Sequence, residues 1–344
     1  MISSNTPDEQ TRTSRAGWML LLRTLVSVGM LGFLLQGVPR DELKTMWSGW
    51  DTRDLEWLGG AAGLTTLAIG LAALRWRRVL ETLSHRPSLY RLVILNLAGH
   101  FVSNFLPTTV GGDVLRVRRL GRRLGDFPRC FASVVIERLT GWVVLPILSL
   151  SAFVINPGLG RLGAGSRTAI GMAIVTLVVL LLILSVAEHP RIGRRLEGTG
   201  NIRVTLSGLH LGLGEFRRQP RAVVNLVTVG VFYQLSLIAA TAMAAEAVGI
   251  DVSPTAWLAF APAVLIAQVL PLSIGGLGLR EGALVLFLGP LGVSDADAIL
   301  LGLILYAINL AVSLLGAPSF AYGWIRGYDK VVETPQSDRG DTNP

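Results

Sequence analysis

A twelve-residue pattern occurs twice in this chain, with the two copies 164 residues apart. Residues 106–117 read LPTTVGGDVLRV, and residues 270–281 read LPLSIGGLGLRE. One Pro, two consecutive Gly and one Arg coincide at the same offsets, and an amide side chain, Asn104 or Gln268, stands three residues before each Pro. Paired apolar segments that Gly and Pro interrupt, in corresponding halves of a chain, indicate the binding site of a membrane transporter.

Long apolar stretches place most of the chain in a membrane. Hydrophobic residues make up 51% of the sequence and charged residues 16%, and several apolar stretches reach the ~20 residues that cross a bilayer. These stretches lack the polar face that a helix of a soluble domain needs. The full spans expected are residues 17–36, 58–74, 132–154, 167–187, 222–246 and 297–324. The interrupted segments are residues 92–121 and 256–289, each broken at its Pro and Gly pair.

Basic residues orient these segments. The formal net charge is +8, and the basic residues are almost all Arg. They concentrate in segments 75–91, 118–129 and 188–221, whereas connectors 247–255 and 290–296 contain no Lys or Arg. Because basic connectors stay in the cytoplasm, both termini are expected there. In a membrane protein such charge reports topology and contact with anionic lipid, so no nucleic-acid partner is expected.

The two interrupted segments then face opposite sides of the membrane. Segment 92–121 has basic flanks, which predicts a hairpin that enters and leaves from the cytoplasm. Segment 256–289 ends in connectors without basic residues, which predicts a hairpin that enters from outside. Together they predict an inverted repeat of two units, residues 58–154 and 222–325. The alternative is that each interrupted segment spans fully, with a kink.

The rest of the chain is polar and short. Residues 1–16 form a cytoplasmic arm before an uncleaved apolar anchor, residues 17–325 form one membrane domain, and residues 326–344 form a polar cytoplasmic tail expected to be disordered. The longest connector, 188–221, is too short for a soluble catalytic domain. The single cysteine, Cys130, excludes an internal disulfide and a cysteine metal cluster. No histidine spacing indicates a metal and no Gly-rich loop indicates a nucleotide, so no cofactor is expected.

The repeated motif suits an anionic ligand. Pro107 and Pro271 stop a helix, and the Gly pairs allow backbone turns that other residues disfavour. A half-helix that begins after such a turn directs unpaired N–H groups and its positive dipole end into a cavity. Arg116 and Arg280 follow one turn later, where they are expected to bind one phosphate from opposite sides near the membrane midplane.

Each charged residue of the motifs also has a structural alternative. An Arg can extend toward a lipid headgroup or form an internal ion pair, and Asp113 and Arg116 have the i,i+3 spacing of a helical pair. Glu281 follows Arg280 directly. Neither acid has an acidic counterpart in the other copy. We therefore expect the two carboxylates to have one of three roles: to contact a cationic group of the lipid, to titrate during transport, or to balance the charge of the arginines.

Several other polar residues lie in apolar segments. Glu137 and Arg138 are adjacent, and adjacent helical residues point about 100° apart, so we expect them not to face one cavity together and to form a helix-end pair or an interhelical bridge. His100 is expected to be a packing donor. The remaining polar residues are expected to form hydrogen bonds between helices: Tyr233, Gln234, Tyr306 and Asn309.

At residues 104–116 and 271–281 the chain resembles a known family. The patterns N-F-L-P-x-x-x-G-G-D-x-x-R and P-x-x-x-G-G-x-G-x-R-E are similar to those of the flippase-like transmembrane region of lysylphosphatidylglycerol synthases, and the resemblance covers about residues 17–325. It implies a membrane region that moves lipid across the bilayer. A synthase domain is not expected in this chain, so lysine transfer is not implied. Relatives that accompany glycosyltransferases make polyprenyl and glycosylated lipids candidates.

The sequence therefore predicts an all-α integral membrane protein with about six full spans and two re-entrant or broken hairpins. We expect it to move an anionic or phosphate-bearing lipid across the cytoplasmic (inner) membrane of a bacterium or archaeon, by binding the lipid headgroup and without enzymatic activity. The alternative is a non-catalytic subunit that supports a separate lipid-modifying enzyme or glycosyltransferase. An enzyme acting on a headgroup is disfavoured because no catalytic constellation emerges. The substrate-binding residues expected are Asn104, Pro107, Gly111, Gly112, Asp113, Arg116, Gln268, Pro271, Gly275, Gly276, Arg280 and Glu281.

Overall fold

The computed structural model describes residues 51–105, 111–187, 218–269 and 276–325, together with 210, 212 and 214–216. The N-terminal arm, the first expected span at 17–36 and the polar tail at 326–344 lie outside the described residues. So do Pro107, Pro271 and Gly275 of the repeated motif.

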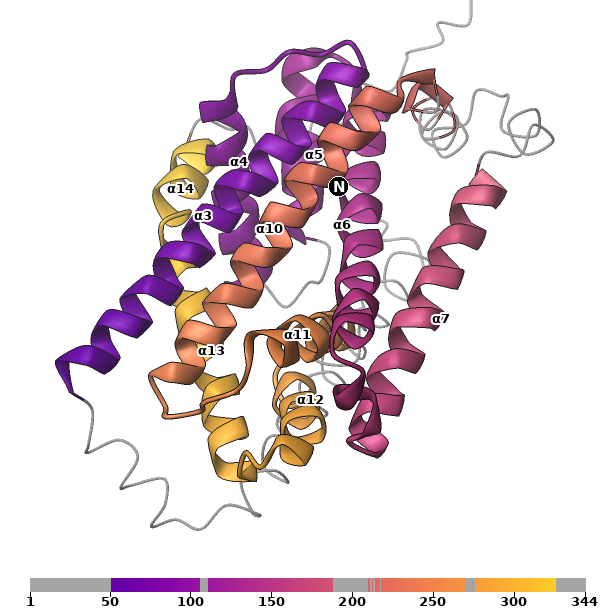
Figure 1. Cartoon of the computed structure of the whole chain (residues 1–344). Coiled ribbons are helices and arrows are strands. Elements are labelled where there is room, and N and C mark those ends of the chain that lie inside the picture. The colour runs from indigo at the N-terminus through magenta and orange to yellow at the C-terminus, as the bar shows by residue number, and fades with distance from the viewer. Residues whose placement is uncertain are drawn as a thin grey trace, which may run out of the picture.

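The described part of the chain is helical and contains no strand (Figure 1). The helices are α3 (Thr52–Thr82), α4 (Leu89–Phe105), α5 (Gly111–Leu124), α6 (Phe127–Ile155), α7 (Ala164–Ala187), α10 (Pro220–Glu246), α11 (Pro254–Val269), α12 (Leu279–Leu288), α13 (Asp295–Leu314) and α14 (Ala317–Ile325). Two short 3-10 helices, Pro157–Arg161 and Gly289–Leu291, join α6 to α7 and α12 to α13. The prediction of an all-α membrane protein is confirmed.

Five of these helices are long and apolar enough to cross a membrane, namely α3, α6, α7, α10 and α13. They correspond to five of the six predicted spans. The expected span at 297–324 is wrong as a single helix, because α13 ends at Leu314 and α14 begins at Ala317. Pro318 lacks the N–H that would bond to the Leu314 carbonyl, which favours a break in the helix at this point. Gly316 in the turn lies against α4, where a Cβ would come within 2.0 Å of the Leu97 carbonyl oxygen.

The two motif regions fold as helical hairpins. Helices α4 and α5 pack against each other, as do α11 and α12. They contain 17, 14, 16 and 10 residues, which corresponds to about 15–25 Å of helix and is less than the ~30 Å bilayer core. Each hairpin begins and ends at the same end of the bundle, and the two hairpins occupy opposite ends (Figure 1). This arrangement favours the re-entrant interpretation over two kinked spans.

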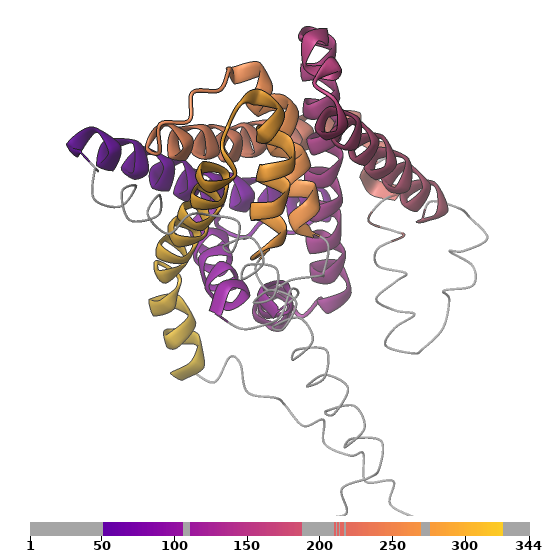
Figure 2. The same cartoon turned by 90° about the horizontal axis from the view of Figure 1, so that it is seen from below.

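The packing repeats in inverted order. Helices α3, α4, α5 and α6 of the first unit correspond to α10, α11, α12 and α13 of the second. The contact between α4 and α13 corresponds to that between α11 and α6, and the contact between α3 and α13 corresponds to that between α10 and α6. Likewise, the contact between α5 and α6 corresponds to that between α12 and α13. Helices α3 and α10 lie side by side and run in opposite directions (Figure 1). Seen from below, the α11–α12 hairpin stands between α13 and α6 (Figure 2).

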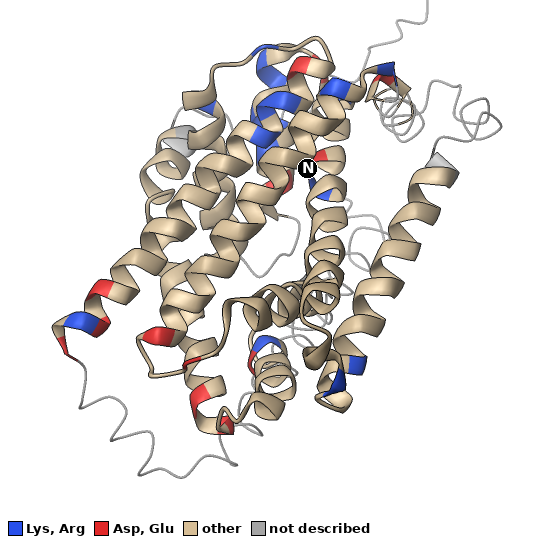
Figure 3. Cartoon of the chain, viewed as in Figure 1, with Lys and Arg blue, Asp and Glu red and all other residues tan. Residues whose placement is uncertain are grey.

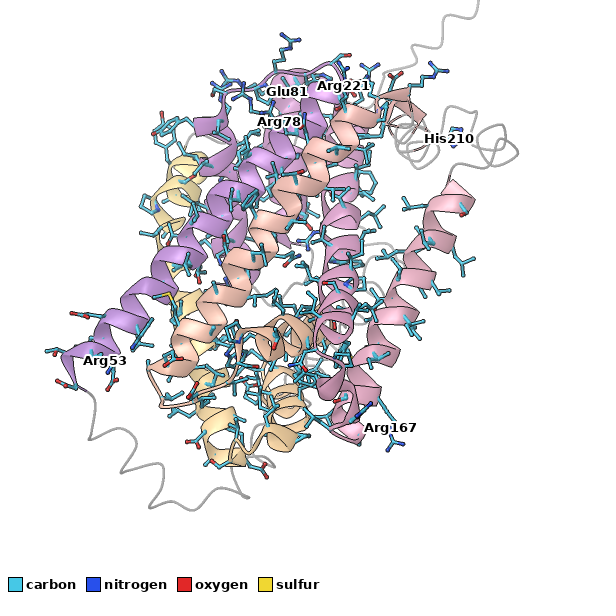
Figure 4. All side chains as sticks on the ribbon, viewed as in Figure 1. Arg53, Arg78, Glu81, Arg167, His210 and Arg221 are labelled. Carbon is cyan, nitrogen blue, oxygen red and sulfur yellow. The ribbon has the colours of Figure 1, made fainter. Side chains whose placement is uncertain are left out.

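Many charged residues lie toward the two ends of the bundle. Basic residues occur along α5 up to the end where this helix terminates, and acidic residues lie near the connections of α10, α11 and α13 at the other end (Figure 3). Figure 4 labels Arg78 and Arg221 at the first end and Arg53 and Arg167 at the second. The α4–α5 hairpin therefore opens toward the more basic end, as its flanking sequence predicts.

Apolar packing centres on α11. Phe260 of this helix lies edge-on to Phe153 of α6 and stacks on Phe287 of α12, with centroid distances of 5.6 and 6.0 Å. Small buried residues of α11 let the neighbouring helices approach closely, as Ala256, Ala259 and Ala263 illustrate. This tight apolar cluster lies on the second unit, whereas buried charge concentrates on the first.

Candidate functional site

A cavity of about 340 Å³ lies among α3, α4, α5, α6, α10, α11 and α13. Its volume falls within the ~300–1,000 Å³ typical of small-molecule sites. Its wall contains charged residues, amides, hydroxyls and aromatic rings, at a depth where the helices around it are apolar. The polar and charged lining residues are Thr65, Arg75, Asn96, His100, Ser103, Asp113, Arg116, Glu137, Arg138, Tyr233, Gln234, Gln268 and Asn309.

Five charged residues form an alternating chain along the cavity wall. Glu137 Oε1 accepts from Arg75 Nε at 2.9 Å and from Arg75 Nη2. Glu137 Oε2 accepts from Arg116 Nη2 at 3.4 Å. Arg116 Nη1 donates to Asp113 Oδ1 at 3.3 Å, and Arg138 Nε donates to the other Asp113 oxygen. Three arginines against two carboxylates give this wall an excess of one positive charge.

Aromatic rings hold two of these guanidinium groups. Arg116 lies over the Trp76 ring, with its Cζ 4.2 Å from the ring centroid, and Arg75 lies over Tyr233 at 4.6 Å. The Trp76 Nε1 in turn donates to Ser133 Oγ at 2.9 Å. Cation–π contacts of this kind strengthen when they are desolvated, so both arginines are fixed in place before any ligand arrives.

Four buried polar atoms of the cavity residues have no hydrogen-bond partner, namely Arg75 Nη1, His100 Nε2, Arg116 Nε and Gln234 Oε1. The side chains of Arg75 and Arg116 are only 5% and 8% exposed. A buried polar atom without a partner costs about 1–3 kcal/mol, so such atoms indicate a place for ordered water or a ligand. Two donors on cationic groups, one amide acceptor and one imidazole nitrogen thus have no partner among the residues of one cavity.

Glycines bring the α4–α5 hairpin close enough to build this wall. A Cβ on Gly112 would lie 2.2 Å from the Gly99 carbonyl oxygen and 2.3 Å from Ser103 Oγ. Helix α5 begins at Gly111, and Gly112 and Asp113 in its first turn line the cavity. The positive end of the α5 dipole therefore meets the cavity, as the motif predicts.

A second, smaller cavity of about 50 Å³ contains Arg280. Arg280 Nη2 and Nε donate to Glu281 Oε1 at 2.6 and 3.1 Å, and Glu281 Oε2 accepts from the Gly278 N–H at 2.6 Å. The two cavities share five lining residues, which are Thr65, Leu237, Leu265, Gln268 and Asn309. Arg116 and Arg280 thus occupy adjoining cavities and do not face one shared space in this conformation.

The predicted site residues divide accordingly. Gly112, Asp113, Arg116 and Gln268 line the large cavity. Arg280 lines the small cavity, and Glu281 is buried in its ion pair with Arg280. Gly276 packs against Gln268, and Gly111 is the first residue of α5. The Asn104 amide donates to the His100 carbonyl. Asp113, Glu137 and Glu281 each contact a guanidinium, which favours their role in balancing the arginines.

The expectation that Glu137 and Arg138 do not share a cavity is wrong. Both line the large cavity. His100, which was expected to be a packing donor, lines it as well. So do Tyr233, Gln234 and Asn309, which were expected to form hydrogen bonds between helices.

Arg75 is a lining residue that the sequence interpretation missed. It was assigned to the basic connector 75–91, whereas α3 continues to Thr82 and places Arg75 two turns inside the helix. The available signal was the continued apolar pattern after it, since Trp76, Val79 and Leu80 are all buried.

Comparison with known proteins agrees with this architecture. The family described as the lysylphosphatidylglycerol synthase TM region matches residues 20–316. The chain belongs to this family. No curated protein matches the chain. For this member of the lysylphosphatidylglycerol synthase TM family, the match supports a multi-pass membrane location and a role related to membrane lipid. The matched range contains both hairpins, the ion chain of the large cavity and Arg280 of the small one.

Proposed function

We propose that this chain moves a phosphate-bearing lipid across the bilayer. The observation that carries the proposal is the pair of buried, unpartnered guanidinium nitrogens, Arg75 Nη1 and Arg116 Nε, in a cavity with excess positive charge. Charged residues at membrane depth are costly and mark pathways for polar groups. Guanidinium groups match the oxygens of a phosphate in geometry and charge.

Access for the headgroup is proposed beside Arg138. This residue lies 11 positions into α6, about 16 Å along the helix axis, and its side chain is 45% exposed while it contacts Asp113 in the cavity. Val114 on α5 and Phe131 on α6 are 49% and 37% exposed. A phosphate could thus reach Arg138 and then the cavity while the acyl or prenyl tails remain against apolar side chains in the bilayer.

Movement across the membrane is proposed to use the inverted repeat. Rocking of one unit against the other would bring Arg280 and its adjoining cavity into the path after Arg116, with Gln268 and Asn309 at the boundary between them. The proposal places no bond-making or bond-breaking step on the chain. It sets the protein in the cytoplasmic membrane of a bacterium or archaeon, where a lipid-modifying enzyme or glycosyltransferase would act as its partner.

The test is lipid movement in reconstituted vesicles. Wild type, Arg116→Gln, Arg116→Lys and Arg280→Gln are compared at equal amounts of folded protein, with an acyl-labelled anionic phospholipid. A charge-assisted contact contributes about 1.5–3 kcal/mol, so each Gln variant should lose about ten- to a hundredfold in binding. Lysine restores charge without the planar fork and should rescue only in part.

Arg53→Gln is the matched control, since Arg53 is exposed at the start of α3. It should move lipid as wild type does. Unchanged movement in both Arg116→Gln and Arg280→Gln would remove the phosphate-binding role and leave the arginines as structural anchors, as expected of a supporting subunit.

A further inference from the structure

His100 differs from the other titratable residues in the wall of the large cavity. The others are held by ion pairs or by a guanidinium that lies over their ring, and among the described lining residues they are Arg75, Asp113, Arg116, Glu137, Arg138 and Tyr233. His100 has a buried Nε2 without a hydrogen-bond partner. A histidine ordinarily changes its charge between about pH 5 and 8, so this ring can exchange a proton without the loss of an ion pair.

We infer that His100 is a proton-binding residue of this cavity, and that binding of a phosphate-bearing lipid is coupled to the uptake of one proton on its imidazole. The inference rests on the proposed function and adds the proton as a second ligand of the same site.

The first argument is that no residue around His100 supplies a counter-ion. Helix α4 packs against α3, α5, α13 and α14. The charged lining residues on these helices are Arg75, Asp113 and Arg116, while α13 contributes the neutral Asn309 and α14 contains no charged residue. Across the cavity, α6 and α10 add Glu137, Arg138 and Tyr233.

Both carboxylates of this set already contact two guanidinium groups each. A positive charge on His100 would therefore add to the excess of one that the wall has without a ligand. A bound phosphodiester offsets this excess and supplies oxygens that accept from a protonated ring. Lipid thus favours the protonated ring and, by reciprocity, the protonated ring binds lipid more tightly.

The second argument is the number of donors on the ring. The side chain of His100 forms a hydrogen bond with that of Asn309 on α13. Because Asn309 Nδ2 donates to the Leu305 carbonyl at 3.3 Å, the amide oxygen is the atom that can accept from the ring. A neutral imidazole has one N–H, and an imidazolium has two. Only the protonated ring can donate to Asn309 and to a phosphate oxygen at once.

The third argument is the position of the ring. A Cβ on Gly99 would lie 3.1 Å from Arg116 Cδ, so the residue before His100 lies against the side chain whose Nε has no partner. Asn309 lines both the large and the small cavity. A proton on His100 therefore acts between the arginine proposed to bind phosphate and the boundary that the headgroup is proposed to pass.

The experiment measures proton uptake when the full chain in detergent binds dihexanoyl phosphatidylglycerol. This lipid is a phosphodiester and keeps its single charge, so any proton taken up belongs to the protein. Calorimetric titrations in two buffers of different ionisation enthalpy give the number of protons. Wild type should take up a proton on binding and bind about tenfold more tightly at about pH 5.5 than at pH 8.

Two reciprocal variants locate the proton. His100→Gln should bind without proton uptake and with the same affinity at both pH values. His85→Gln, His189→Gln and His210→Gln together leave His100 as the only histidine and should behave as wild type. The ratio of affinities at two pH values within one variant does not depend on the folded fraction at either site, provided that this fraction is measured at each pH by thermal unfolding.

Binding without proton uptake in wild type, or uptake that persists in His100→Gln, would overturn the inference. Lipid movement in vesicles is measured separately and decides the proposed function. Movement without proton uptake leaves the proposed function intact and removes the coupling. Proton uptake on binding without movement supports His100 as the proton-binding residue of a lipid site and removes the transport role.

Discussion

At the scale of single residues, the charged side chains in the wall of the large cavity neutralise one another in ion pairs. Glu137 and Asp113 each contact two guanidinium groups, and Arg116 joins the two carboxylates. Removing one partner of a buried ion pair costs about 3–5 kcal/mol, because it leaves a buried charge without compensation. The positions of Arg75 and Arg116 therefore determine both the stability of the bundle and the charge that a ligand meets.

Gly141→Ala tests this dependence without removing a charge. An added Cβ would lie 2.7 Å from Arg75 Nη1 and 3.2 Å from its Cζ, so the guanidinium has to shift and its contact with Glu137 is disturbed. We expect a loss of about 1–3 kcal/mol in unfolding free energy, as for other overpacked sites, and slower lipid movement. Thermal unfolding in detergent and vesicle assays measure the two effects.

Two glycines serve as controls for this substitution. Gly230 is buried, yet a Cβ there makes only ordinary contacts, the nearest at 3.4 Å from Val144, and Gly63 faces open space. Alanine at either position should preserve or slightly raise stability, since alanine is the better helix former. A loss at Gly230 equal to that at Gly141 would show that small size, and not the position of Arg75, is what matters.

At the scale of elements, the two hairpins use their glycines differently. In the α4–α5 hairpin, Gly112 allows backbone approach to Gly99. In the α11–α12 hairpin, Gly276 adopts a φ of +79° and packs on Gln268, where a Cβ would lie 3.1 Å from Cγ. Gln268 borders both cavities. The turn at Gly276 thus determines where this amide sits in the proposed path.

Gly276→Val should impair lipid movement more than Gly59→Val or Gly63→Val. Valine strongly disfavours a positive φ, and its side chain would push against Gln268, whereas Gly59 and Gly63 have open space around them. Initial rates in reconstituted vesicles, normalised to folded protein, measure the effect. Equal losses at all three positions would reduce the motif to ordinary small-residue packing.

At the scale of the whole molecule, the inverted repeat makes a topological prediction. The connection from α10 to α11 and that from α12 to α13 lie at one end of the bundle, and the connection from α5 to α6 lies at the other (Figure 1). The side of the membrane that each end faces is predicted from the arginine distribution. Residues 120–128 and 200–215 are expected in the cytoplasm, with 248–253 and 292–296 outside.

Single cysteines introduced at these positions, in a Cys130→Ala background, test the topology by labelling from each side of the membrane. Cys130 is fully buried, so alanine at this position removes the native thiol and leaves a small cavity. Labelling of 248–253 and 292–296 from opposite faces would make the second interrupted segment a true span and end the inverted-repeat interpretation.

Local sequence patterns were sufficient for much of the fold. Five spans and both hairpins follow from stretch length, Pro and Gly placement and basic flanks, because the bilayer imposes these features on each segment separately. The break before α14 could also have been recognised, since Pro318 removes the bond to Leu314. For the site, the motifs indicated Gly112, Asp113, Arg116 and Gln268, and these four line the large cavity.

The rest of the site arises from packing between distant helices. Arg75 on α3 meets Glu137 on α6 across 62 positions, and Tyr233 on α10 covers the guanidinium. No local spacing relates these three residues. Arg280 was placed with Arg116 because their motifs match, but the structure separates the two arginines into adjoining cavities.

The unequal charge of the two units has an energetic consequence. If the units were identical, exchanging their conformations would interconvert two states of equal free energy. Here the first unit contributes the five-residue ion chain, whereas the second contributes the Arg280–Glu281 pair, with Leu277 at the position that Asp113 holds in the first. When the two units exchange conformations, five charged residues of the first unit change their solvation, but only two of the second unit do so. Since about 1.4 kcal/mol is a tenfold population ratio, we expect the empty protein to rest predominantly in one orientation.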